Sequence, residues 1–446
     1  MKKIVTALVL FCFVVSSFAG CDLTLSHGST EHPHEQFSTT VPVQVQYEGF
    51  YSVDRSIIDI KSEYYSSAEL NRGYESLESE AMRICYKKID NSVYYIAKEK
   101  SAGKEVYNTL KITLQGQVLS EAELRVVISA YFCDHPQVYW IDNNFEYAVG
   151  STKTVLQLFS FMSGREIELS AEKLNKKANE VISKAGRGLD EYERELFIHD
   201  RVVEACDYAE DVKSIQDDYK AFTAYGALVE GKAVCEGYSR LFQMLLSAVG
   251  IESYGVLGVG SYELHMWNCV EIYGDWYYVD TTWAEDKEVG VCYDYFNLST
   301  DQLEIDHVIN PLYSELTDEQ ICGNEWTEPK SFNVIVPECN DKNQNYYQKS
   351  AVTIDDFSQE SKDKLKEAII FAAENCAGER FPVYIHIGTG MYYDYAVENL
   401  FYSGEFFFFS CLDEINEEGK VSIDRYNVSI RRIGSMAGVN VYLSTE

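Results

Sequence analysis

The chain has 446 residues, of which 46% are apolar and 14% aromatic, enough for roughly three domains that each bury a core. This composition excludes a disordered or fibrous protein. Acidic residues outnumber basic ones by 71 to 38, which gives a formal net charge of −33. Such a charge repels phosphate backbones and anionic lipid headgroups, so nucleic acid is excluded as a partner.

The N-terminus has the pattern of an exported bacterial protein. A lysine pair precedes an uncharged apolar run over residues 4–18, which is shorter than the roughly 20 residues of a membrane-spanning helix. The following Phe18-Ala19-Gly20-Cys21 resembles the bacterial lipobox, in which the cysteine is acylated and becomes the mature N-terminus. We therefore predict a signal peptide over residues 1–21 and lipidation at Cys21. Ordinary secretion, with Cys21 as a bystander, is the alternative.

Residues 22–46 predict a flexible tether, because they are rich in Ser, Thr, His and Pro and lack apolar periodicity. With Cys21 lipidated, the tether would hold the globular part on the extracellular face of a bacterial membrane, and the lipid would be its only membrane contact. His27, His32 and His34 lack accompanying cysteine or carboxylate spacing, so no metal site is predicted.

The first globular region, residues 47–165, mixes helix and strand patterns and is predicted to be α+β. A strand is expected over residues 92–97 and a helix over residues 120–131. The turn signal Asp134-His135-Pro136 precedes another expected strand over residues 137–141.

A long helical block is predicted over residues 170–209. Gly186-Arg187-Gly188 interrupts it, and Asp190 with Glu193 three positions later predicts a capping box that restarts it. His199 lies on the apolar stripe of the second helix and is expected to pack in the core.

Cys235 is predicted to open a buried helix. Apolar residues follow it at helical spacing, and glycines lie on either side at positions 231 and 250. A thiol at that place feels the positive end of the helix dipole, which favours the thiolate, and a nearby imidazolium would favour it further. An isolated cysteine at a helix start is nevertheless more often a packing residue.

Residues 265–272 and 276–283 predict two antiparallel strands joined by a tight turn at Gly274-Asp275. Side-chain alternation places His265 and Asp280 on the same face.

The expected register leaves these two side chains apart. A two-residue turn at Gly274-Asp275 would set Asp280 opposite Cys269, four residues or roughly 13 Å along the strand from His265. A bulge, a slipped turn or strong coiling must close that gap. If it closes, a cysteine nucleophile, a histidine base and an orienting carboxylate complete the set used for acyl transfer.

Three motifs follow one another in this region, and together they resemble the transglutaminase-like superfamily of papain-like thiol enzymes, in particular its bacterial exported members. They are Val234-Cys235-Glu236-Gly237-Tyr238, His265-Met266-Trp267-Asn268 and Val279-Asp280-Thr281-Thr282-Trp283. The resemblance covers about residues 192–307. It implies an α+β fold with a papain-like, transglutaminase-like core, in which the helix carrying the cysteine packs on an antiparallel sheet carrying the histidine and the aspartate.

The resemblance also implies roles for these residues. Cys235 would be the nucleophile, His265 the base that later protonates the leaving amine, and Asp280 the group that orients the imidazole. The oxyanion would be held by the backbone N–H of Cys235 and a second donor, for which Tyr225 is the candidate. A half-buried packing tyrosine is the alternative for Tyr225.

Trp267 and Trp283 are candidates for the walls of a substrate channel, with hydrophobic packing as the alternative. His307, which the resemblance also reaches, is expected to be structural. No acidic cluster has the EF-hand spacing, so we expect no calcium, and we predict no cofactor.

The transglutaminase-like core is predicted to span residues 166–326, and residues 327–446 are predicted to form a compact C-terminal α+β module of unknown function. Helices are expected there over residues 359–375 and 393–401, and strands over residues 382–388, 405–411, 422–430 and 439–443. The run Phe406 to Phe409 is interpreted as part of a buried strand.

Two classes of function fit this pattern. The first is a surface-anchored thiol enzyme that forms a thioester on Cys235 and acts on amide bonds, as a peptidase, an amide hydrolase or a protein-glutamine acyltransferase. Hydrolysis is favoured because water is always present outside the cell and nothing marks an amine-binding site. The second is a catalytically silent binding or scaffold protein. The acidic surface favours a basic or lysine-containing protein or peptide as the partner.

Lipid anchoring leads to the first prediction. The chain made in a bacterial host should partition into detergent, and Cys21→Ala should release it into the aqueous phase. The measurement is phase separation followed by intact mass. A wild-type mass without a diacylglyceryl group would contradict the lipidation.

Overall fold

A computed structural model describes residues 47, 49–101, 104–286, 290–322, 331–375, 380–404 and 406–445. The predicted signal peptide, lipidation site and tether lie outside these residues. Across the described ranges, the helices all fall short of the length and apolarity that a membrane span needs.

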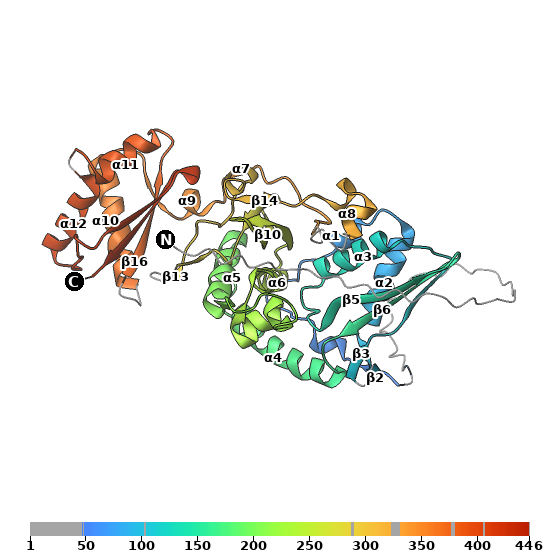
Figure 1. Ribbon diagram of the computed structural model, residues 1–446. Coiled ribbons are helices and arrows are strands. Elements are labelled where there is room, and N and C mark those ends of the chain that lie inside the picture. Colours follow the sequence, from blue (N-terminus) through green and yellow to red (C-terminus); the bar gives the residue numbers. More distant parts are fainter. Residues whose placement is uncertain are drawn as a thin grey trace, which may run out of the picture.

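The N-terminal region is a six-stranded antiparallel sheet with helices beside it (Figure 1). Its strand order is β1-β2-β3-β6-β4, with β5 also paired to β6. The strands are β1 (Tyr51–Ser52), β2 (Tyr95–Ser101), β3 (Lys104–Asn108), β4 (Ile112–Gln115), β5 (Ile141–Val149) and β6 (Lys153–Ser160). The helices are α1 (Arg72–Ser76), α2 (Glu80–Ser92) and α3 (Glu121–Asp134).

Two strand predictions in this region were wrong in part. The strand expected from residue 92 begins at Tyr95, because α2 continues to Ser92. The strand expected over residues 137–141 is largely a turn, since β5 begins only at Ile141. Trp140 is nonetheless fully buried, and its indole N–H donates to the Val93 carbonyl at 2.9 Å. The apolar residues that predicted a strand are therefore buried in an irregular segment.

The predicted helical block consists of α4 (Gly164–Ile182) and α5 (Glu191–Ala205). The capping box at Asp190 and Glu193 is present, which confirms the predicted restart. The first helix begins six residues earlier than predicted because Ser163 and Glu166 form another capping box. His199 is fully buried, as expected of a packing residue.

The core predicted over residues 166–326 is built on α6 (Cys235–Ala248), which packs on a four-stranded antiparallel sheet. The sheet order is β11-β10-β9-β14. The strands are β9 (Ser253–Gly260), β10 (Glu263–Ile272), β11 (Asp275–Val279) and β14 (His307–Ile309). The fold is therefore α+β, as predicted.

Side-chain alternation gives this sheet two buried faces. Val270 and Ile272 of β10 belong to the large apolar core that also contains α6. Trp267 and Cys269 of the same strand belong to a second apolar cluster, which also includes Tyr347 near the C-terminal module. The sheet therefore needs cover from both sides.

The hairpin turn lies one residue earlier than predicted. Ile272 pairs with Asp275, so the two-residue turn is Tyr273-Gly274. Both turn residues have positive φ, 55° and 90°, which is the conformation of the type I′ hairpin turn. The slip sets Asp280 two residues closer to His265 along the neighbouring strand than the predicted register did.

Shorter elements complete the core region. They are β7 (Asp207–Tyr208), β8 (Lys232–Ala233), β12 (Glu285–Asp286), β13 (Gly290–Val291), α7 (Thr300–Leu303) and α8 (Asp318–Cys322). Short 3-10 or π turns occur in all three regions of the chain. They are η1 (Arg55–Ile57) in the N-terminal region, η2 (Tyr219–Phe222), η3 (Gly226–Glu230) and η4 (Tyr313–Glu315) in the core region, and η5 (Gly434–Met436) in the C-terminal module.

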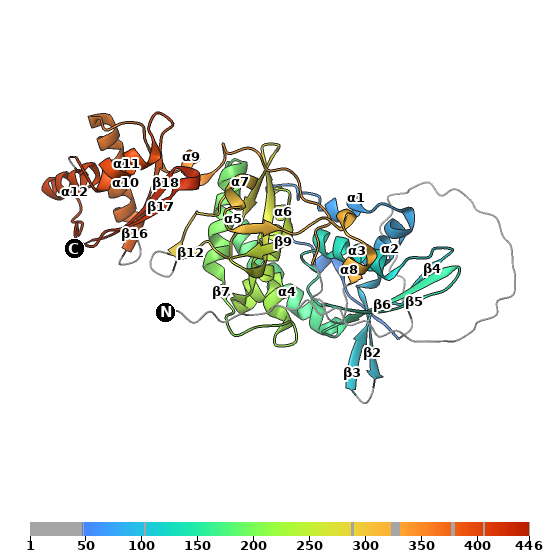
Figure 2. The same ribbon diagram turned by 45° about the horizontal axis from the view of Figure 1, so that its top comes forward.

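The C-terminal module lies at one end of the molecule, with the core between it and the N-terminal sheet (Figure 2). Its own sheet has the order β15-β16-β18-β17, in which only β15 and β16 are parallel. The strands are β15 (Val352–Ile354), β16 (Arg380–Ile387), β17 (Ser429–Ile433) and β18 (Gly438–Ser444). The helices are α9 (Tyr346–Lys349), α10 (Gln359–Asn375), α11 (Tyr393–Phe401) and α12 (Phe407–Glu418).

The helices predicted over residues 359–375 and 393–401 are confirmed, but the strand predicted over residues 405–411 is wrong. That segment begins α12, whose buried residues Phe408, Cys411, Leu412 and Ile415 recur at helical spacing. Phe406 to Phe409 are consecutive apolar residues, so the sequence there does not distinguish helical spacing from strand alternation. The strand predicted over residues 422–430 is also wrong for most of its length, since β17 begins at Ser429.

One apolar cluster runs from Val53 to Val334 and joins the N-terminal region to the core, and another lies within the C-terminal module. The proposed boundary at residue 165 falls within α4, one residue after the helix begins. The boundary at residue 326 lies outside the described residues. The domain limits therefore stay predictions.

Close packing along β9 leads to the second prediction. A Cβ at Gly258 would lie 2.3 Å from both the Trp267 ring and the backbone oxygen of Val308. Gly258→Ala should lower the free energy of unfolding by about 2–3 kcal/mol because neither group can move easily. Gly255→Ala on the same strand is the matched control, since its Cβ would meet only the terminal methyl of Met266. Urea unfolding should show the larger loss for Gly258→Ala, and equal losses would contradict this account.

Candidate functional site

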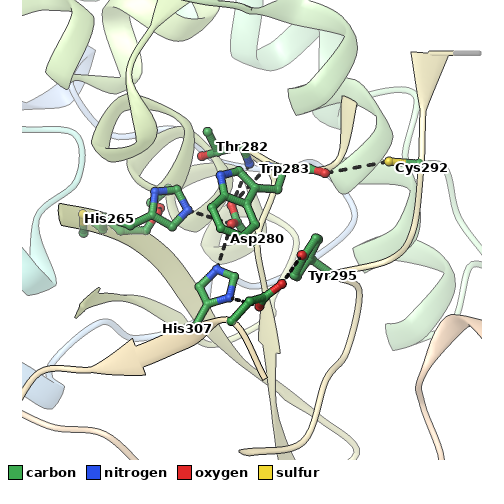
Figure 3. A network of polar contacts seen from close by, with 10 residues as sticks. His265, Asp280, Thr282, Trp283, Cys292, Tyr295 and His307 are labelled. Atoms are coloured by element: carbon green, nitrogen blue, oxygen red, sulfur yellow. Dashed lines mark hydrogen bonds and ion pairs between the residues drawn. The ribbon is translucent and has the colours of Figure 1, made fainter. Parts of the chain in front are cut away.

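A buried histidine–aspartate pair is the centre of the candidate site (Figure 3). His265 lies near the start of β10, and Asp280 follows the last residue of β11. The His265 Nε2 and Asp280 Oδ2 atoms are 2.7 Å apart, and both side chains are almost completely buried. The slipped turn has therefore halved the offset that the predicted register left, from four residues to two, and the two side chains bridge the rest.

Cys235 reaches this pair from the other structural layer. It is the first residue of α6, which packs on β9 and β10. Cys235 acts on His265 electrostatically, because it contributes to raising the pKa of the imidazole. Because the Nε2 atom of His265 faces Asp280, the Nδ1 atom is the ring nitrogen left for the thiol. The structure thus brings the three predicted residues together.

The electrostatics of the site favour a charged imidazole. Burial alone would lower the pKa of His265, but the neighbouring Asp280 carboxylate and, to a smaller extent, Cys235 outweigh it and raise that pKa to about 10. Burial of Asp280 acts against its charge as well, yet His265 and His307 hold the pKa of this carboxyl well below its usual range. At neutral pH the pair is an imidazolium and a carboxylate.

Asp280 is held from several directions. Its Oδ1 atom accepts the backbone N–H of Thr282 at 2.9 Å and that of Trp283 at 3.4 Å. Its Oδ2 atom also faces the Nε2 atom of His307 at 3.4 Å. The carboxylate that orients His265 is therefore itself fixed in position, as a precise site requires.

His307 continues the network behind Asp280. Its Nδ1 atom lies 2.7 Å from the Oδ1 atom of Asp306, and the Tyr295 hydroxyl donates to the other oxygen of Asp306 at 2.6 Å. The sequence predicted His307 to be structural, and its complete burial agrees with a supporting position.

The atoms of His265, Asp280 and His307 that could ligate a metal lie within 4.8 Å of one another. Both rings, however, already face the single Oδ2 atom of Asp280 at hydrogen-bond distance. We therefore describe this group as a hydrogen-bond network and assign no metal to it.

The two candidate channel tryptophans lie in different places. Trp283 is half-buried and stacks on His265, with ring centroids 5.0 Å apart. A Cβ at Gly260 would lie 3.0 Å from Trp283 and 3.1 Å from His265, so this glycine leaves room for the stack. Trp267 is fully buried in the second apolar cluster, which is the packing position.

Tyr225 also takes a packing position. It is buried, and its ring stacks on Tyr139 with a centroid distance of 5.3 Å. It precedes the short η3 turn, two elements before Cys235. The described contacts of Tyr225 do not join it to His265 or Asp280.

Sequence reasoning missed Tyr208, which comes from β7. Burial is the main cause that raises the pKa of Tyr208, and the neighbouring Cys235 and Glu263 raise it further. Tyr208 is therefore coupled electrostatically to the candidate nucleophile, and 43% of the residue's surface is exposed. Tyr208 precedes Cys235 by 27 positions and belongs to none of the three motifs, so no sequence signal pointed to it.

The charge state of His265 leads to the third prediction. Its folded-state pKa of about 10 exceeds the unfolded value of roughly 6.5, so the stability that it contributes is fully present below about pH 6.5 and is lost as the pH rises through about 10. Asp280→Asn should lower the free energy of unfolding by about 3 kcal/mol at pH 7. The difference in free energy of unfolding between Asp280→Asn and wild type should shrink between pH 7 and 10.5.

Urea unfolding at several pH values measures this difference. Asp306→Asn is the matched control, because Asp306 contacts His307 and not His265. Its difference from wild type should stay constant over the same pH range. A constant difference for Asp280→Asn would contradict the charged pair.

Three solved structures resemble the chain in part. One, described as the crystal structure of a TGase, is 12% identical, has a TM-score of 0.25, and is matched over 40% of this chain and 52% of its own. A candidate cysteine protease from Cytophaga hutchinsonii is 16% identical, with a TM-score of 0.22, over 30% of this chain and 55% of that one. A candidate protease from Parabacteroides distasonis is 13% identical, with a TM-score of 0.19, and is matched over 41% of this chain and 35% of its own. The chain spans about half the length of the first two.

No curated protein matches the chain. Residues 177–281, however, match the family model of the transglutaminase-like superfamily. This segment contains α5, α6 and the strands from β9 to β11, and with them Cys235, His265 and Asp280. The chain thus contains a segment, residues 177–281, that is similar to the transglutaminase-like superfamily.

Proposed function

We propose that this protein is a thiol enzyme that acts on amide bonds through Cys235, His265 and Asp280. The observation that carries the proposal is the buried 2.7 Å hydrogen bond between His265 and Asp280 beside a cysteine at a helix N-terminus. A thiolate is stabilised there by the helix dipole and by an imidazolium. The imidazolium is in turn stabilised by the carboxylate.

The proposed reaction begins with attack of the Cys235 sulfur on the carbonyl carbon of an amide. The carbonyl oxygen becomes an oxyanion, for which the backbone N–H of Cys235, at the N-terminus of α6, is the candidate donor. His265 gives its proton to the leaving amine, and a thioester remains on Cys235. Water or a second amine then resolves the thioester, with His265 taking the proton of the attacking group.

We favour water as the second nucleophile. A transferase needs a walled channel that keeps water out while an amine enters. Both tryptophans considered for such walls lie beside His265, but Trp267 is fully buried, so Trp283 alone remains as a candidate wall. A peptidase or amide hydrolase needs no such channel.

The proposed substrate is a basic or lysine-containing protein or peptide. The chain carries a formal charge of −33, and the carboxylates of Glu263 and Glu210 act electrostatically on Tyr208, as Cys235 does. Acidic groups attract cationic substrates toward the site. The proposed place of action is the extracellular face of a bacterial membrane, with Cys21 lipidated.

The fourth prediction tests the activity. Glutamine-containing peptides offered together with a labelled primary amine should be cleaved or deamidated more often than they are coupled to the amine. Cys235→Ala and His265→Ala should each lower the rate at least about a thousandfold, because nucleophile and base act as one unit. Mass spectrometry of both products provides the measurement.

Cys322→Ala is the matched control, since Cys322 is more exposed than Cys235 and lies in α8, away from the network. It should leave the rate unchanged, and an electrophile should label Cys235 first in both proteins. Amine incorporation without cleavage would establish a transferase. No turnover, with Cys235 unreactive toward the electrophile, would favour the catalytically silent scaffold.

A further inference from the structure

Two cysteines meet on the face of the core sheet that lies opposite α6. Cys269 belongs to β10, four residues after His265, and Cys339 lies in the segment that leads to the C-terminal module. Their sulfur atoms are 3.4 Å apart, although 70 positions separate the residues in the sequence. Both side chains are fully buried.

The surroundings of Cys269 are fixed by the sheet. Cys269 pairs with Tyr254 of β9 on one side and with Tyr278 of β11 on the other. Both tyrosines are buried in the second apolar cluster. The strand that carries Cys269 therefore has a partner on each side and cannot shift by itself.

Cys339 is fixed by its backbone. Its carbonyl accepts the N–H of Thr300, at the start of α7, at 2.7 Å. The two cysteines thus face each other from two anchored segments, and their sulfurs, 3.4 Å apart, need to approach by little more than 1 Å to reach the S–S bond length of about 2 Å.

We propose that Cys269 and Cys339 form a disulfide when the chain folds in an oxidising compartment. The proposal is independent of the proposed enzymatic function, since neither cysteine belongs to the network of His265 and Asp280.

The oxidant is a disulfide of a small thiol or of a thiol–disulfide exchange protein. One cysteine attacks this disulfide as a thiolate and forms a mixed disulfide, releasing one thiol of the oxidant. The second cysteine then attacks the mixed disulfide and releases the other thiol. Two protein thiols lose two hydrogens in all, and one disulfide of the oxidant becomes two thiols.

The exchange belongs to folding and not to the finished structure. Burial and the adjacent Cys339 raise the pKa of Cys269 well above its usual value, which disfavours the thiolate that exchange requires. The same burial shields a disulfide, once formed, from small reductants.

The cross-link would fasten the C-terminal module to the strand of the candidate site. The second apolar cluster joins Trp267 and Cys269 to Tyr347, Tyr384 and Met436, which belong to the C-terminal part of the chain. A disulfide between Cys269 and Cys339 would hold this cover on the sheet and close a loop of about 70 residues, a length at which cross-links restrict the unfolded chain strongly.

The fifth prediction is tested on the full wild-type chain, refolded with a mixture of reduced and oxidised glutathione or with reductant alone. Free thiols are blocked with iodoacetamide in denaturant, and the protein is digested without reduction. Mass spectrometry should find the peptides of Cys269 and Cys339 joined after oxidative refolding only, and Cys235 blocked in both samples. Blocked Cys269 and Cys339 in the oxidised sample, or either of them joined to a different cysteine, would overturn the proposal.

Thermal unfolding gives a second readout. The oxidised wild type should unfold about 5–10 °C above the reduced wild type. Cys339→Ala should show no difference between the two preparations, whereas Cys85→Ala, a matched change at another fully buried cysteine, should keep the wild-type difference. An equal difference in Cys339→Ala and wild type would also overturn the proposal.

Discussion

The hydrogen bond between His265 and Asp280 is the interaction on which the rest of the site depends. Two opposite charges removed from water are costly unless the geometry is close and the remaining atoms are satisfied. Here the Nε2 and Oδ2 atoms lie 2.7 Å apart, and backbone N–H groups of the following turn hold the other carboxylate oxygen. The Asp280 carboxylate raises the pKa of His265, and the proposed function depends on the resulting positive charge acting on Cys235.

The sequence predicted which residues meet, but not the register that lets them meet. Alternation along two strands placed His265 and Asp280 on one face, because side-chain direction depends only on local geometry. The turn was predicted one residue too late. Gly274 was expected to be the first turn residue because glycine readily adopts a positive φ, whereas the first turn residue is Tyr273, with a φ of 55° that tyrosine seldom takes. Tertiary pairing of β10 and β11 decided this position, and no local pattern records it.

Other errors have the same origin. Capping boxes and helical spacing predicted α5, α10 and α11 well, because their signals lie within one turn of the helix. The segment of α12 was taken for a strand, since its consecutive phenylalanines fit either period until packing selects one face. Tyr208 and the contact of His307 with Asp280 were missed because both depend on segments brought from outside the three motifs.

The family match ends at residue 281, yet the site depends on residues beyond it. His307, from β14, reaches the Oδ2 atom of Asp280. The face of β10 that carries Trp267 and Cys269 is covered by the segment around Cys339 and by residues of the C-terminal module. Without that cover, apolar side chains directly beside His265 would face water, and water would weaken the attraction between the charges. The C-terminal part of the chain therefore contributes to the candidate site by keeping one side of the sheet dry.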